Sequence, residues 1–117
     1  MPAFSEGTDG TAADRGNCFV VAKTANFTVS ATDVPVSATD ICFDLSGDVT
    51  VGTTATIPPN STLALPKGSK IVFAQGITGS TVITPGAGVT LVGASPTVAA
   101  TTGRTAIQIA TNKWFLY

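Results

Sequence analysis

The sequence predicts an all-β protein, and two patterns support that prediction. Apolar and polar side chains alternate over residues 27–31 and again over residues 40–46. Beyond residue 48, short apolar segments are separated by Gly and Pro turn residues about every eight to twelve positions. No segment places its apolar residues at helical spacing. The chain is therefore expected to form a compact β-sandwich, a jelly-roll-like fold or a small barrel.

The first two predicted strands show the alternation most clearly. Every second position of residues 27–31 is apolar, and Ile41, Phe43 and Leu45 repeat the pattern within residues 40–46. A period of two is that of a strand with one buried face. Residues 17–34 contain neither Gly nor Pro and are long enough for a helix, but their Thr, Ser and Asn content favours strands.

The rest of the chain is predicted to form short strands joined by tight turns. Pro58-Pro59-Asn60, Pro66-Lys67-Gly68 and Pro85-Gly86 are typical turn sequences, because Gly adopts positive φ and Pro presets φ. The predicted strands are residues 48–51, 55–57, 62–65, 70–74, 81–84, 89–92, 97–100, 105–110 and 113–117.

The expected core takes the large apolar positions of these strands. It comprises Val49, Val51, Ile57, Leu63, Leu65, Ile71, Phe73, Val82, Val89, Leu91, Ile107, Ile109, Trp114 and Leu116. Gln108 lies between Ile107 and Ile109, so it is expected to face outward or into an interface.

Two regions are expected along the chain, an extended N-terminal arm with the first strand in residues 1–35 and a β-domain in residues 36–117. In residues 1–16, three glycines are interspersed with short polar residues, and Met1 and Phe4 are the only large apolar groups. Such a segment cannot form its own core, so it either lies along a neighbouring protein or stays a solvated terminus. The candidate partner-binding residues of the arm are Phe4, Glu6, Asp9, Asp14 and Arg15.

Charge is scarce and unevenly placed. Charged residues make up 11% of the chain, against about 25% in an average globular protein, and the net charge is −1. Residues 1–48 hold seven acidic and two basic side chains, a balance of −5, whereas residues 49–117 hold four basic ones, a balance of +4. The split suggests head-to-tail contacts between copies or a basic partner, or it reflects chance in a charge-poor chain.

The same composition argues against several classes of function. The basic residues are too few and scattered for a nucleic-acid groove. No apolar run approaches the ~20 residues that span a bilayer, and no secretory signal is visible at the start, so no membrane partner is expected.

Residues for catalysis, cofactor binding or metal binding are not apparent. The chain has no histidine, and Asp40 and Asp44 would lie ~13 Å apart along a strand, wider than the ~5–9.5 Å of glycosidase carboxylate pairs. A hydrolase or lyase acting on glycans is therefore disfavoured. Cys18 and Cys42 match no zinc pattern and are expected to be buried free thiols, with a disulfide as the alternative.

Several runs in residues 49–117 together carry a resemblance to known proteins. They are Val49-Thr50-Val51, Pro59-Asn60-Ser61-Thr62, Leu65-Pro66-Lys67-Gly68-Ser69, Ile71-Val72-Phe73-Ala74-Gln75-Gly76, Gly86-Ala87-Gly88-Val89-Thr90-Leu91 and Gly103-Arg104-Thr105-Ala106-Ile107-Gln108-Ile109-Ala110-Thr111-Asn112-Lys113-Trp114. In this order they resemble a C-terminal β module of bacteriophage structural proteins, which include capsid decoration (cement) proteins and tail-fibre proteins.

The resemblance implies a non-enzymatic virion protein that is assembled in the bacterial cytoplasm. The leading expectation is a homotrimeric decoration protein that clamps capsomers of the major capsid protein on the outer capsid surface. The alternative is a tail-fibre or receptor-binding tip module. The aromatic end formed by Trp114, Phe115 and Tyr117 is expected either to pack in the core or to form the oligomer interface.

Overall fold

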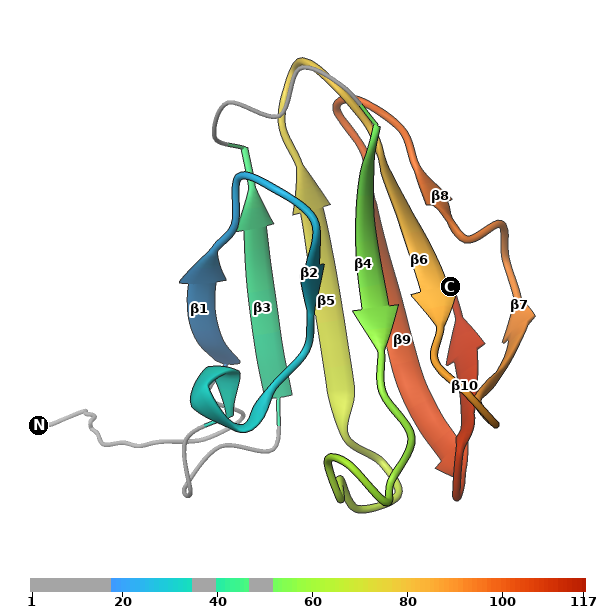
Figure 1. Ribbon diagram of the computed structural model, residues 1–117. Coiled ribbons are helices and arrows are strands. Elements are labelled where there is room, and N and C mark those ends of the chain that lie inside the picture. Colours follow the sequence, from blue (N-terminus) through green and yellow to red (C-terminus); the bar gives the residue numbers. More distant parts are fainter. Residues whose placement is uncertain (1–17, 35–39, 47–51) are drawn as a thin grey trace, which may run out of the picture.

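The computed structural model describes residues 18–34, 40–46 and 52–117 and confirms the all-β prediction. Two sheets pack face to face as a sandwich (Figure 1). The six-stranded sheet contains β1 (Cys18–Ala22), β3 (Asp40–Leu45), β5 (Lys70–Gln75), β9 (Gly103–Ala110), β10 (Lys113–Leu116) and β7 (Thr90–Gly93), in that spatial order. The four-stranded sheet contains β2 (Phe27–Thr28), β4 (Thr53–Ile57), β6 (Thr81–Pro85) and β8 (Thr97–Val98).

The chain crosses between the two sheets after almost every strand. Strands β1, β3 and β5 are parallel neighbours in one sheet, and β2, β4 and β6 are parallel neighbours in the other. The first six strands therefore form three turns of a flattened coil. The C-terminal part then closes the sandwich with antiparallel pairs, β9 with β5 and β10, and β8 with β6. The sequence predicted the strands but not their parallel, coiled order.

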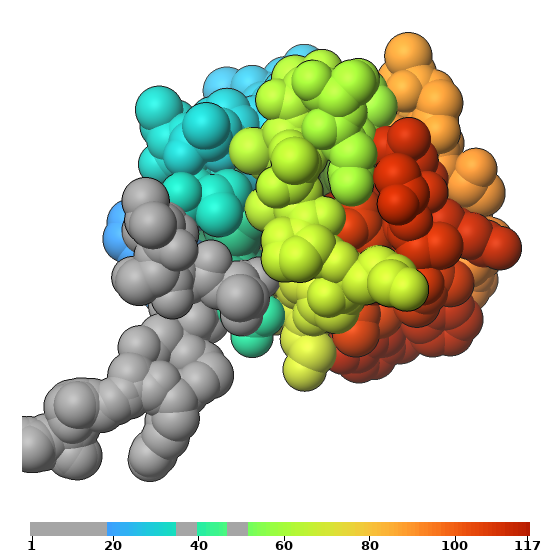
Figure 2. Space-filling view, turned by 90° about the horizontal axis from the view of Figure 1, so that it is seen from below, coloured from blue at the N-terminus to red at the C-terminus, as the bar shows by residue number. Residues whose placement is uncertain are grey.

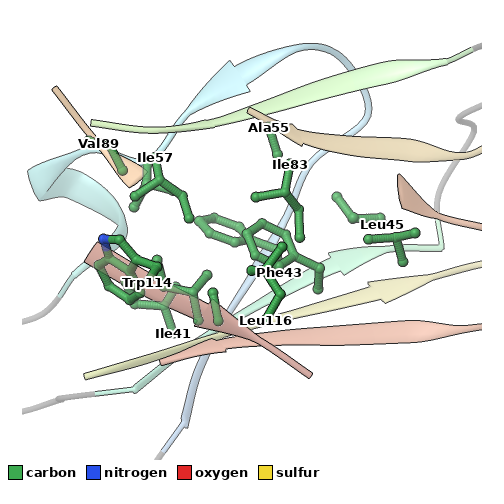
Figure 3. Close-up of a cluster of buried hydrophobic side chains, with 14 of the residues drawn as sticks. Ile41, Phe43, Leu45, Ala55, Ile57, Ile83, Val89, Trp114 and Leu116 are labelled. Atoms are coloured by element: carbon green, nitrogen blue, oxygen red, sulfur yellow. The ribbon is translucent and has the colours of Figure 1, made fainter. Parts of the chain in front are cut away.

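The core lies between the sheets (Figure 3) and is built from the inward positions of the strands. Phe43 of β3 lies opposite Phe73 of β5, and the two rings stack with centroids 5.7 Å apart. Trp114 and Leu116 project inward from β10, each 1% exposed. Because parallel in-register strands align their inward positions, successive turns stack apolar side chains in columns. Burial of each large side chain contributes about 1.5–3 kcal/mol.

The predicted core is partly confirmed. Ile57, Leu65, Ile71, Phe73, Val89, Trp114 and Leu116 are buried as expected. Leu63 and Leu91 pack against the core and are half-buried. Val49 and Val51 lie outside the described residues. Val82 and Ile109 are exposed, so their assignment to the core was wrong.

Strand β9 explains the largest of these errors. Its register places Ala106 opposite the buried Ile71, so Ala106 and Gln108 face the core. Ile107 and Ile109 therefore face outward, and the expectation that Gln108 faces outward was also wrong. In β6, Thr81 and Ile83 are buried in the same way, which turns Val82 outward.

The N-terminal strands and one turn complete the description. Residues 17–34, interpreted as strands, contain β1 and β2, which pair with β3 and β4, followed by a 3-10 turn η1 (Ala31–Asp33). The expected boundary between arm and β-domain, at residues 35–36, lies outside the described residues. The strand predicted for residues 62–65 is instead a turn, because the amides of Thr62 and Leu63 both donate to the carbonyl oxygen of Pro59.

Candidate interaction surface

The six-stranded sheet turns one face toward the core and the other away from it. The second of these is called the outer face, and its residues follow from strand register. Val20, Cys42, Val72 and Thr105 form one row across β1, β3, β5 and β9. Asp40, Lys70, Ile107, Phe115 and Val92 form the neighbouring row across β3, β5, β9, β10 and β7.

Large apolar side chains remain exposed on this face. Val20 is 62% exposed, and Ile109, Phe115 and Tyr117 are exposed as well. Phe115 and Tyr117 stack on each other, with ring centroids 6.2 Å apart. Val72 of β5, Ile107 of β9 and Val92 of the edge strand β7 are half-buried on the same face. Single exposed apolar residues, such as Val20 on the edge strand β1, are ordinary on proteins. The apolar side chains of the neighbouring strands β5, β9, β10 and β7 form a patch, however, and such a patch is typical of a protein contact surface.

Charged residues occupy distinct strands of the outer face. Asp40 and Asp44 lie along β3, Lys70 lies on β5, and Lys113 lies on β10 at the far side. The side-chain hydroxyl and the backbone N–H of Ser46 both donate to Asp44, and these bonds lower the pKa of its carboxyl. Asp44 is therefore ionised at neutral pH, and the β3 side of the outer face carries negative charge.

The structure separates the three residues of the predicted aromatic end. Trp114 lies in the core, and its indole Nε1 has no hydrogen-bond partner in the described part of the chain. Phe115 and Tyr117 lie on the outer face, so they alone of the three present surface to a partner. The five arm residues, Phe4, Glu6, Asp9, Asp14 and Arg15, lie outside the described residues.

Sequence reasoning missed the aliphatic part of the surface. Val20, Val72 and Ile107 were not considered as contact residues, since Ile107 was assigned to the core. The register of β9 with β5 places Ala106 beside the buried Ile71, and no local pattern in residues 103–110 signals this register.

A partly buried polar cluster lies at one end of the sandwich, at the turn that follows β4. Figure 2 shows the yellow-green turn segment beside the red C-terminal strands at this end. The Asn60 amide N–H donates to Oδ1 of Asn112 at 2.7 Å, and the side-chain amides of Asn60 and Gln108 lie 2.8 Å apart. The other end of the Gln108 amide faces the Leu65 and Pro66 carbonyls, and its nitrogen donates to both when it points there. The Gln108 oxygen then faces Asn60, whose side-chain amide must be turned as well so that its nitrogen donates to Gln108. The cluster fixes the turn against β9.

Cys42 is a free thiol, as expected, although it is half-buried rather than buried. The Cys18 side chain is not among those described. In the described ranges, no three His, Cys, Asp or Glu side chains lie close enough to hold a metal ion together. None of the helical structure there is long and apolar enough to cross a membrane.

In comparisons with known proteins, no family model, curated protein or solved structure matched the chain.

Proposed function

We propose that the protein is a structural subunit of a bacteriophage virion, a homotrimeric decoration protein that contacts the major capsid protein on the outer capsid surface. The observation that carries the proposal is the apolar outer face of the six-stranded sheet. Val20, Phe115 and Tyr117 expose large apolar side chains there, and covering them removes apolar surface from water.

The coiled sandwich suits a structural role because its strands are short and cross-linked by the core in every turn. Phe27, Phe43 and Phe73 form a continuous aromatic contact from the first turn to the third. A rigid body of this kind can hold a contact surface in a fixed orientation toward its neighbours, which lowers the entropy lost on assembly.

The arm adds the second part of the proposal. The arm would contact the major capsid protein through Phe4, Glu6, Asp9, Asp14 and Arg15. A subunit that binds several capsomers at once gains affinity through effective concentration. The excess of acidic residues in the first 48 positions would complement a basic patch on the capsid.

A binding experiment on capsids tests this function. Expanded capsids that lack the protein are incubated with the purified full-length chain, and bound protein is measured after sedimentation. We expect saturable binding and a higher capsid disruption temperature. Absence of binding, or an unchanged disruption temperature with the sites filled, contradicts the proposal. A chain without residues 1–16 is the matched variant, and it is expected to bind more weakly.

A further inference from the structure

We propose that a second copy of this chain covers the outer face, with the β3 side of one copy against the β10 side of the other. The inference deepens the structural role proposed above, since it names the partner that buries the apolar face. It rests on the size of the face, on its charge layout and on its strand order.

The area of the face suits a subunit interface. Six strands spaced ~4.8 Å apart, each with about five residues rising ~3.3 Å, give a face of roughly 480 Å² in projection. Two such faces therefore bury about 1,000 Å², and the relief of their side chains raises this toward the ~1,200 Å² of the smallest specific interfaces.

The charge layout selects the orientation of the two copies. Asp40 and Asp44 lie on β3, the second strand of the sheet, Lys70 lies beside Asp40 on β5, and Lys113 lies on β10, the fifth. The β3 side therefore keeps an excess of one negative charge after Lys70 is counted. A contact that places β3 against β3 brings like charges together, which opposes association. Placing β3 against β10 brings the carboxylates toward Lys113 and leaves the apolar rows of β5 and β9 in the middle.

Register supports the Asp40–Lys113 pairing. Asp40 and Phe115 lie in the same row, because Asp40 pairs with Lys70, Lys70 with Ile107 and Ile107 with Phe115. Lys113 lies two residues before Phe115 on β10. A symmetry axis parallel to the strands preserves these levels. Lys113 of one copy then lies about 7 Å along the strand direction from Asp40 of the other, within reach of a lysine side chain. Two arrangements meet this condition: a ring of three copies whose outer faces surround a three-fold axis, and a face-to-face dimer. The expected homotrimer corresponds to the ring.

The first test uses two aspartate substitutions with matched exposure. Phe115 on the outer face and Val82 on the opposite sheet are both 40% exposed. Light scattering after size exclusion gives the mass of the full-length chain, whose monomer is 11.7 kDa. We expect an oligomer for the unaltered protein and for Val82→Asp, and at least ~30-fold weaker association for Phe115→Asp, because the new carboxylate would face Asp40 of the other copy. Fluorescence of the buried Trp114 verifies that both variants are folded.

The second test exchanges the charges. Asp40→Lys and Lys113→Asp should each weaken association, and the double variant should recover most of the loss, because the pair is then restored in reverse. A monomeric unaltered protein at tens of micromolar, equal effects of Phe115→Asp and Val82→Asp, or no recovery in the double variant would each overturn the inference. If the protein is a monomer that still binds capsids, the interface is contradicted and the proposed function is not. If it is an oligomer that does not bind capsids, the proposed function is contradicted and the interface is not.

Discussion

The ammonium nitrogen of Lys23 lies 3.1 Å from Oδ1 of Asp33, and the Asp33 side chain is only 4% exposed. The other carboxylate oxygen accepts a hydrogen bond from the Ser30 backbone N–H at 3.0 Å. The same Lys23 nitrogen lies 5.3 Å from the centre of the Phe27 ring. These contacts join the end of β1, the strand β2 and the turn η1, so they hold the first turn of the coil together.

We therefore predict that Asp33→Asn destabilises the fold by about 1–3 kcal/mol. The amide can still accept the Ser30 hydrogen bond, but Lys23 loses the charge that compensates its partial burial. Urea denaturation followed by Trp114 fluorescence measures the change. Lys67→Gln, at an exposed lysine in the turn that follows β4, is the control. Equal losses in the two variants would show that the Lys23–Asp33 pair contributes nothing specific.

Gly93 and Gly88 provide a second prediction. Both have positive φ, +98° and +78°, so alanine is strained at either position. A Cβ at Gly88 would meet open space, whereas a Cβ at Gly93 would overlap the backbone carbonyl oxygen of Leu116 on the adjacent strand β10. Gly88→Ala should therefore cost about 1 kcal/mol, and Gly93→Ala should cost more, because β7 must move away from β10. Thermal denaturation of the two variants compares them, and similar midpoints would contradict the pairing of β7 with β10.

Gln108 gives a third prediction. Gln108→Leu keeps the side-chain size but leaves the Leu65 carbonyl oxygen and the Asn60 side chain without this partner, so we expect a loss of about 1–3 kcal/mol. Ile77→Gln, at a side chain 84% exposed, should change stability by less than ~0.5 kcal/mol. Chemical denaturation again gives both values. If Gln108→Leu were stabilising, the side chain would not be part of a satisfied polar cluster.

The fourth prediction concerns the pKa of Asp44. Ser46→Ala removes the hydroxyl that donates to the carboxylate, so the pKa of Asp44 should rise toward its ordinary value. In the unaltered protein the folded-state pKa lies below the unfolded one. The resulting stabilisation is present above the unfolded pKa and is lost as pH falls through the folded pKa. A carboxyl-carbon NMR titration of the two proteins measures the pKa, and equal values would contradict the Ser46 contact.

Local pattern predicted most of the strands but not their neighbours. The alternation of Ile41, Phe43 and Leu45 was enough to define β3, because one face of that strand is fully buried. The parallel pairing of β3 with β1 and β5 joins segments far apart in the sequence, and no short-range pattern encodes it. The sequence was therefore sufficient to predict a β-sandwich as one of the possible folds. It was not sufficient to predict that β1 to β6 follow one another as turns of a flattened coil.

The outer face shows the same limit for the candidate site. Ile107 and Ile109 are more hydrophobic than Ala106 and Gln108, so local hydrophobicity assigned the wrong pair to the core. Which residues of β9 face the core depends on the space between the sheets and on the carbonyls near Leu65. Both are properties of the assembled fold. The exposure of Phe115 and Tyr117 beside the burial of Trp114 follows once β10 is placed between β9 and β7.

The number of copies of this chain in a purified virus particle tests the central claim most directly. Quantitative mass spectrometry against the major capsid protein measures it in particles from cells that produce the chain. A decoration protein is predicted to be present in hundreds of copies per particle, in a fixed ratio to the capsid protein. A few to a few dozen copies would place the chain in the tail, and its absence from particles would contradict a structural role in the virion.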